Sequence, residues 1–126
     1  MKVVLSHDFG ADFVADMRRL HPQIELCPAY TEEECLQHLE NAEVFIGEIT
    51  PETFRAGRQL KWFHYVGIGF DKFVDNIPGF VESDIFFTNC RQTHVIAMAD
   101  HVFALILAFA HCVPELLQDQ HLSHIH

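Results

Sequence analysis

Short apolar runs along the chain alternate with segments whose hydrophobic residues recur at helical spacing. Five of these runs predict β-strands, at residues 3–6, 24–26, 43–47, 62–66 and 84–89. After the first run, hydrophobic residues recur at steps of four and three, which predicts one face of a helix: Phe9, Phe13, Met17 and Leu20. Strands that alternate with helices are typical of a parallel α/β sheet.

Local signals mark where two of the predicted helices begin. Thr31 stands three residues before Glu34, which is the spacing of a capping box. Thr50, Pro51 and Glu52 supply a cap, a proline suited to the first turn, and an acid that matches the helix dipole. We therefore expect helices after the second and third strands.

The longest apolar stretch runs from Val95 to Val113. It predicts one long helix, from about residue 93 to about residue 118. The complete pattern predicts an α/β fold, a flavodoxin-like doubly wound parallel five-stranded sheet with a long apolar C-terminal helix. We expect the sheet domain to span residues 1–92, and the helix and tail to span residues 93–126.

The predicted C-terminal helix is apolar almost all round, whereas a helix on the surface of one domain should show a polar face. A large apolar patch on a soluble protein usually marks an interface, and twofold pairing is the simplest closed arrangement. We therefore expect a homodimer that buries Val102, Phe103, Ile106, Phe109 and Ala110. A membrane span is the alternative by length, but Asp100 lies within the run and Pro114 ends it, so we expect no membrane partner.

Charge and composition narrow the partners further. The chain has 126 residues, 49% of them hydrophobic, and 18 acidic residues against 8 basic ones give a net charge of -10. A net negative charge repels phosphate, which argues against nucleic acid as a partner. The first residues lack the pattern of a signal peptide, so we expect a cytoplasmic location.

Cysteine and histidine are the residue types that raise the question of metal. Four cysteines occur without any CxxC spacing, and we expect them to be free buried thiols: Cys27, Cys35, Cys90 and Cys112. Three of the ten histidines lie in the last six residues: His121, His124 and His126. Zinc-finger spacing is absent, so we expect no metal site.

Ligands of doubly wound sheets bind at the carboxyl ends of the strands, which directs attention to the loops after Ser6, Gly47, Val66 and Thr88. One of these loops has the sequence VGIGFD, residues 66–71. Its two glycines could bring backbone N–H groups against a carboxylate, or could merely permit a tight turn from strand to helix. The loop is not a dinucleotide fingerprint, because Lys72 occupies the position of the third glycine.

The segments LKWFHYVGIGFDKF and DIFFTNCRQTHVIAMADHVFALILAFAHCVPELLQ resemble the substrate domain of D-isomer-specific 2-hydroxyacid dehydrogenases. The resemblance covers nearly the whole chain and rests on the order and spacing of its motifs, although Asp100 stands where the family commonly has Glu. It implies that the loop of Gly67, Ile68 and Gly69 holds the carboxylate of a 2-keto or 2-hydroxy acid through the backbone amides of Ile68 and Gly69. It also implies a hinge toward a cofactor domain, formed by Thr88, Asn89, Cys90 and Arg91.

In that family a Rossmann domain follows this helix and brings the nucleotide loop, the substrate-binding Arg and the acid–base residues. We expect the chain to stop before that part begins, so NAD or NADP is implied only for the longer protein. Hydride transfer needs a nicotinamide and a proton donor beside the substrate. We therefore expect this chain to have no cofactor site or catalytic residue of its own, to bind a small acid weakly and to be inactive alone.

Three other interpretations of the sequence can be compared with particular residues. A signal-receiver domain needs paired acids, a phosphorylatable Asp and a Lys, where this chain has Asp8 alone, Glu48 and Arg91. His64 on a strand and His94 beside a helix start are typical of hydrogen-bonded structural histidines. The alternative function is a stand-alone, non-enzymatic module that binds small carboxylates or dimerises.

Overall fold

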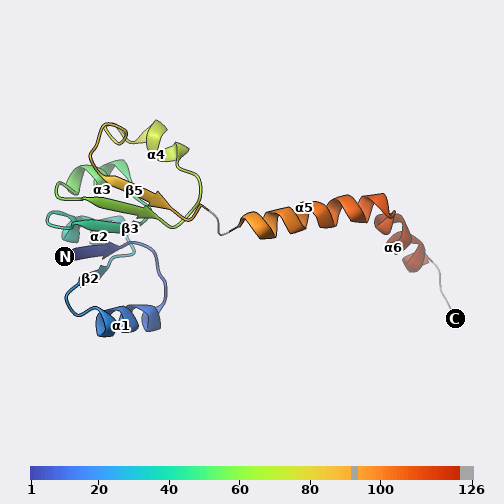
Figure 1. Cartoon of the computed structure of the whole chain (residues 1–126), viewed down its shortest axis with the longest axis horizontal. Helices are drawn as coiled ribbons and strands as arrows, with labels where there is room; N and C mark the ends of the chain where they lie inside the picture. The colour runs from blue at the N-terminus through green and yellow to red at the C-terminus, as the bar shows by residue number, and fades with distance from the viewer. Residues whose placement is uncertain (92–93, 123–126) are drawn as a thin grey trace. The chain divides into compact units, whose positions relative to one another are not determined.

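The computed structural model describes residues 1–91 and 94–122, with side chains as far as residue 120 (Figure 1). Two compact units make up the chain, Met1–Arg91 and Gln92–His126. Each unit is described separately below.

The first unit is a five-stranded sheet in which every neighbouring pair of strands is parallel. Its strands are β1 (Lys2–Leu5), β2 (Glu25–Pro28), β3 (Val44–Gly47), β4 (Trp62–Tyr65) and β5 (Phe86–Asn89), in the order β2-β1-β3-β4-β5. The predicted parallel five-stranded sheet is therefore confirmed, and most strand bounds differ from the predicted ones by one or two residues. Pro28 ends β2, an edge strand, where the missing N–H of a proline interrupts no interior ladder.

Four helices connect the strands: α1 (Ala11–Leu20), α2 (Glu32–Leu39), α3 (Pro51–Ala56) and α4 (Asp71–Asn76). The predicted capping box of α2 is present, because the Thr31 hydroxyl accepts from the Glu34 N–H at 3.2 Å and the Glu34 carboxylate accepts from the Thr31 N–H at 3.1 Å. Thr50 caps α3 as predicted, but its reciprocal partner is the Thr53 hydroxyl. Helix α4 is short and has no side-chain cap, and the sequence pattern set no bounds for a helix after the VGIGFD loop.

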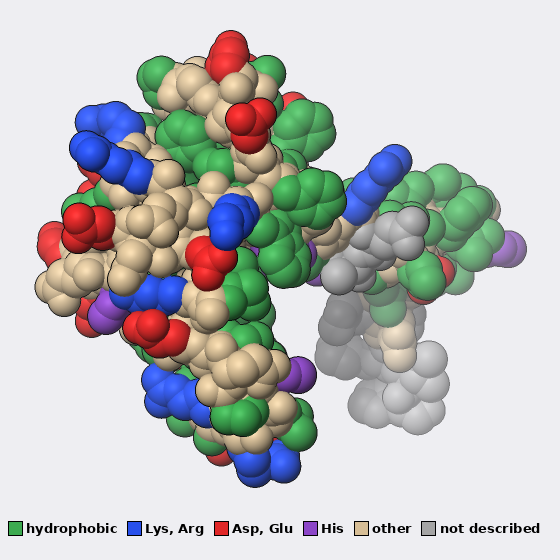
Figure 2. All heavy atoms as spheres, turned by 60° about the vertical axis from the view of Figure 1, so that its left-hand side comes forward, with side chains coloured by type: hydrophobic (Ala, Val, Ile, Leu, Met, Phe, Trp, Pro, Cys, Tyr) green, Lys and Arg blue, Asp and Glu red, His purple; other side chains and the backbone are tan. Residues whose placement is uncertain are grey.

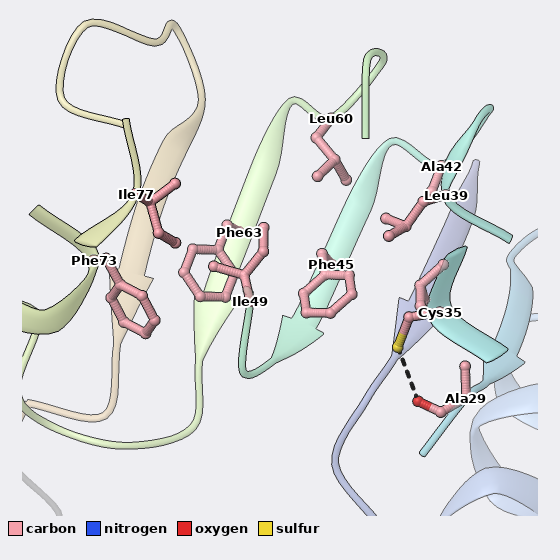
Figure 3. Packing of buried hydrophobic residues seen from close by; sticks show 11 residues of the cluster. Ala29, Cys35, Leu39, Ala42, Phe45, Ile49, Leu60, Phe63, Phe73 and Ile77 are labelled. Atoms are coloured by element: carbon pink, nitrogen blue, oxygen red, sulfur yellow. Dashed lines mark hydrogen bonds between the residues drawn. The ribbon is translucent and has the colours of Figure 1, made fainter. Parts of the chain in front are cut away.

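Alternate residues of the strands face opposite sides of the sheet, and one side forms the main core. Phe45 of β3 and Phe63 of β4 are fully buried there, together with Leu39 of α2 and Phe73 of α4 (Figure 3). The Phe63 ring lies 5.2 Å from the Phe73 ring, edge to face, and 6.0 Å from the Phe45 ring. Each such buried side chain contributes roughly 1.5–3 kcal/mol relative to an exposed one. This aromatic packing fixes β4, and with it the loop that follows.

Within residues 1–91, α1 is the one helix on the opposite side of the sheet (Figure 1). Phe13 and Met17 of α1 line an apolar cavity of about 370 Å³ together with Val3 and Leu5 of β1. The predicted apolar face of α1 thus borders the sheet in part: Phe13 lines the cavity but stays partly exposed, Leu20 is exposed, and Phe9 precedes the helix. The part of this side formed by β4 and β5 carries exposed or half-buried residues, among them Trp62, His64 and Thr88.

The second unit consists of α5 (Val95–Ala110) and α6 (Val113–Leu122). The predicted single helix is therefore wrong: the two helices meet at a bend of 63°, and Cys112 between them has a positive φ of 50°. The cause is Pro114, which lacks an N–H and would clash with the carbonyl of Ala110 in a continuous helix. Thr93, near the predicted start, lies outside the described residues.

Every described side chain of α5 is exposed or half-buried within the chain, including Phe103 at 64% and Phe109 at 70% exposure. Hydrophobic side chains dominate the visible surface of this unit in Figure 2. No single helix among the described residues is long and apolar enough to cross a membrane; α5 with residues 113–120 of α6 passes that test only as a bent pair, by length and composition.

Candidate functional site

Of the four loops at the carboxyl ends of the strands, the loops after β1 and β3 close against each other. The Ser6 hydroxyl accepts from the Glu48 N–H at 3.0 Å. Gly47 has a φ of 134°, and a Cβ there would lie 2.0 Å from the Ser6 oxygen. This close approach explains the glycine at position 47.

The loop after β4, residues 66–70, passes close to the Tyr65 ring at Gly67. A Cβ on Gly67 would lie 2.4 Å from the Tyr65 ring, so any larger residue at this position would have to displace that ring. Gly69 differs, because a Cβ there would meet no atom of the described residues within 4 Å. The two glycines of the motif therefore have different roles: Gly67 leaves room for the Tyr65 ring, whereas Gly69 borders space that no described residue fills.

Residues that follow β5 bind the carbonyl groups of this loop. The Cys90 N–H donates to the Gly67 carbonyl oxygen at 3.0 Å, and the Asn89 side-chain amide donates to the Ile68 carbonyl oxygen. Among the described residues, the N–H groups of Ile68 and Gly69 have no hydrogen-bond acceptor. Adjacent unpaired backbone N–H groups suit a bound anion.

An open cavity of about 660 Å³ lies beside the loop. Its lining combines the loop with residues from the end of β5 and the start of α4: Ile68, Gly69, Phe70, Asp71, Phe87, Asn89 and Arg91. Phe70 and Phe87 supply apolar surface, and Arg91 supplies a positive charge. The structure thus brings Asn89 and Arg91, predicted as hinge residues, together with the predicted substrate loop.

Thr88 and Cys90, the other two predicted hinge residues, belong to the opposite side of the sheet, because successive strand residues alternate in direction. There the Trp62 indole N–H donates to the Thr88 hydroxyl oxygen at 2.8 Å, and that oxygen lies 2.8 Å from His64 Nδ1. The Cys90 sulfur lies 3.6 Å from His64 Nε2. His64 is hydrogen-bonded, as predicted, but its link to Cys90 was not foreseen.

A lysine beside the loop was also missed. Lys72 Nζ lies 2.5 Å from a Glu48 carboxylate oxygen and 4.6 Å from the centre of the Tyr65 ring. Partial burial lowers the pKa of Lys72, but hydrogen bonds to Glu48 and Tyr65 outweigh it and raise the pKa. Lys72 and Glu48 lie on different elements, and no spacing rule connects them.

In the part of the chain that the structure describes, no three His, Cys, Asp or Glu side chains lie close enough together to hold a metal ion. Cys35 is a buried free thiol, but Cys112 is exposed at the bend between α5 and α6, so the prediction of buried thiols is wrong there. Cys27 and Cys90 are half-buried, so full burial is confirmed only for Cys35. His124 and His126 lie outside the described residues, as does the His121 side chain.

No protein-family model matches the chain. Among curated proteins it is similar to the D-3-phosphoglycerate dehydrogenase of Archaeoglobus fulgidus, with 24% identity over 119 residues that cover 91% of this chain and 22% of that protein. Among solved structures it is similar to a D-isomer specific 2-hydroxyacid dehydrogenase family protein from Aeromonas salmonicida, with a TM-score of 0.69 and 18% identity. That match covers 94% of this chain and 38% of the solved one.

The structural likeness shows the fold, an α/β arrangement shared with a domain of a dehydrogenase-family protein. The chain spans about a fifth of the length of the curated relative and less than half of the solved chain. Both similar proteins carry dehydrogenase names, in agreement with the family that the sequence motifs resemble.

Proposed function

We propose that this chain is the substrate-domain portion of an NAD(P)-dependent D-2-hydroxyacid dehydrogenase, and that its loop after β4 binds the carboxylate of a small 2-keto or 2-hydroxy acid. The observation that carries the proposal is that Ile68 and Gly69, whose N–H groups have no acceptor among the described residues, line the same cavity as Arg91. A cytoplasmic location and inactivity of the chain alone belong to the same proposal.

The chemistry of the cavity suits a small monoanion. Two backbone N–H groups can each donate to one carboxylate oxygen, and a guanidinium adds a charge-assisted contact. Asp71 lines the same cavity and disfavours a second negative charge on the ligand. Because the cavity is open and only partly encloses a small acid, we expect a Kd no tighter than about 1 mM, equivalent to about −4 kcal/mol.

The same loop does not fit the pyrophosphate of a dinucleotide. The position that would carry the third glycine is Lys72, whose side chain lies against Tyr65 and Glu48. We therefore assign NAD or NADP binding to residues outside Gly67–Gly69, and give this chain no part in the transfer of hydride.

A second candidate function is dimerisation. The favouring observation is the apolar surface of α5, of which no described side chain is buried within the chain. We propose a homodimer through Val102, Phe103, Ile106, Phe109 and Ala110. Such pairing is compatible with a dehydrogenase and with a stand-alone carboxylate-binding module.

An NMR titration tests the carboxylate site. We expect added pyruvate, at about 20 mM, to shift the amide signals of Ile68 and Gly69 more than those elsewhere. Arg91→Gln should weaken this binding about threefold to tenfold, because a charged hydrogen bond contributes roughly 1.5–3 kcal/mol when buried and less in an open site. Arg58→Gln makes the same charge change at an exposed position outside the cavity and should leave the titration unchanged.

Two results would count against the site. Shifts that centre on other residues would place the acid elsewhere, and equal weakening by Arg91→Gln and Arg58→Gln would reduce the effect to net charge. Pyruvamide, which has the same shape without the carboxylate, should cause no shifts at Ile68 and Gly69.

A further inference from the structure

Four side chains on the α1 side of the sheet form a continuous series of polar contacts. Trp62 Nε1 donates to Thr88 Oγ1 at 2.8 Å, Thr88 Oγ1 lies 2.8 Å from His64 Nδ1, and His64 Nε2 lies 3.6 Å from Cys90 Sγ. Strand pairing creates the series, because the parallel register sets His64 opposite Thr88. Cys90 follows Thr88 by two residues and so returns to the same side.

The donors and acceptors of this series determine what His64 can do. The Trp62 indole nitrogen can only donate, and the Thr88 oxygen has two lone pairs, so it can accept from both Trp62 and the His64 Nδ1–H. In that tautomer the lone pair of Nε2 faces the Cys90 thiol. After a proton moves from sulfur to Nε2, both N–H groups of the imidazolium still have acceptors, Thr88 Oγ1 and the Cys90 sulfur.

This arrangement matches the logic of an activated nucleophile, in which a thiol contacts a base and a third group orients the base. Thr88, itself held by Trp62, is the orienting group. Both His64 and Cys90 are half-buried, so a small reagent has access while the imidazole stays positioned.

The other cysteines have different surroundings. Cys35 is buried, its sulfur donates to the Ala29 carbonyl oxygen at 3.2 Å, and burial raises the pKa of its thiol to about 11. Burial and the neighbouring Glu25 also raise the pKa of Cys27. Cys112 is exposed. Among the described side chains, an imidazole lies within hydrogen-bond distance of the sulfur only at Cys90.

We propose that Cys90 is a nucleophilic thiol activated by His64 and is a site of oxidation by small hydroperoxides. The thiol proton passes to His64 Nε2 as the sulfur attacks the outer oxygen of the hydroperoxide. An S–O bond forms, the O–O bond breaks, and the departing oxygen takes the proton from His64 to leave as water or an alcohol. The sulfur loses two electrons to become a sulfenic acid, and the peroxide is reduced by two.

The proposal does not depend on the carboxylate site, and its test uses hydrogen peroxide with dimedone to trap sulfenic acid. Peptide mass spectrometry of the full chain gives the rate at each cysteine. Exposure alone predicts that Cys112 reacts faster than the half-buried Cys90. We expect the reverse, with Cys90 oxidised at least about tenfold faster at neutral pH. This threshold lies below the gain of about 10²–10⁴-fold that a positioned base usually gives.

Two variants then isolate the base. His64→Gln should bring the rate at Cys90 down to that of Cys112 or below, whereas His38→Gln, on α2, should change neither rate. Buried Cys35 reports folding, since it should stay unmodified in a folded chain. If Cys35 becomes modified in His64→Gln, that variant is not folded, and Thr88→Val is used in its place. Thr88→Val should slow the oxidation of Cys90 several-fold. Two results would overturn the proposal. In the unaltered chain, Cys90 could react no faster than Cys112; or Cys90 in a folded His64→Gln chain could react as fast as Cys90 in the unaltered chain.

Discussion

The Cys90 N–H donates to the Gly67 carbonyl oxygen at 3.0 Å, and this bond joins the end of β5 to the loop after β4. With the Asn89 contact to the Ile68 carbonyl, it occupies two carbonyl groups of the loop, while the N–H groups of Ile68 and Gly69 have no acceptor among the described residues. The candidate site is therefore built by two strand ends acting together.

The two glycines of the loop should respond differently to substitution. Gly67→Ala places a methyl group 2.4 Å from the Tyr65 ring and should lower the free energy of unfolding by roughly 1–3 kcal/mol. Gly69→Ala meets open space, so its effect should stay within about 0.5 kcal/mol. Urea unfolding of both variants measures the difference, and equal losses would contradict the roles assigned here.

Asn89→Asp should weaken pyruvate binding more than it weakens the fold. The change removes the donor to the Ile68 carbonyl and adds a negative charge to the cavity lining. We expect a loss of about 0.5–1.5 kcal/mol in stability and loss of the pyruvate shifts at Ile68 and Gly69. Asn76→Asp is the control, since Asn76 donates to the Lys72 carbonyl but does not line the cavity; loss of the shifts there too would point to net charge.

The buried thiol of Cys35 should make the fold sensitive to alkali. Burial raises its pKa from 9.0 to about 11, so the unfolded chain releases this proton at lower pH than the folded chain. The contribution of Cys35 is therefore complete below pH 9 and is lost as pH rises toward 11. The stability advantage over Cys35→Ala should shrink across that window in urea unfolding. A constant difference would show that the pKa of the thiol is the same in the folded and unfolded chain.

Light scattering tests pairing through α5. We expect a mass near twice 14.5 kDa for the unaltered chain. Phe103→Glu or Ile106→Glu should give a monomer or insoluble protein, because a charge buried in an apolar interface costs several kcal/mol. Gln118→Glu adds the same charge on α6 and should leave the mass unchanged. A stable, soluble monomer of the unaltered chain at about 50 µM would refute a dimer with a Kd in the micromolar range.

Much of the fold follows from the sequence because its signals are local. Apolar runs mark the strands, and the Thr31–Glu34 pair marks the start of α2, since a cap forms between residues that are neighbours in the chain. The break at Cys112 was available from the same kind of signal: Pro114 forbids a continuous helix whatever packs around it. Helix α4 was less accessible, because its six residues are too short for periodicity and have no side-chain cap.

The tertiary structure alone decided which residues meet. The strand register brings His64 to Cys90 across 26 positions, and no pattern within one segment encodes that distance. The different roles of Gly67 and Gly69 likewise depend on where the Tyr65 ring lies, which sequence spacing does not specify. Local hydrogen bonding and periodicity determine the elements of this protein, whereas side-chain chemistry at its sites arises from contacts between elements, which exist only once the sheet is assembled.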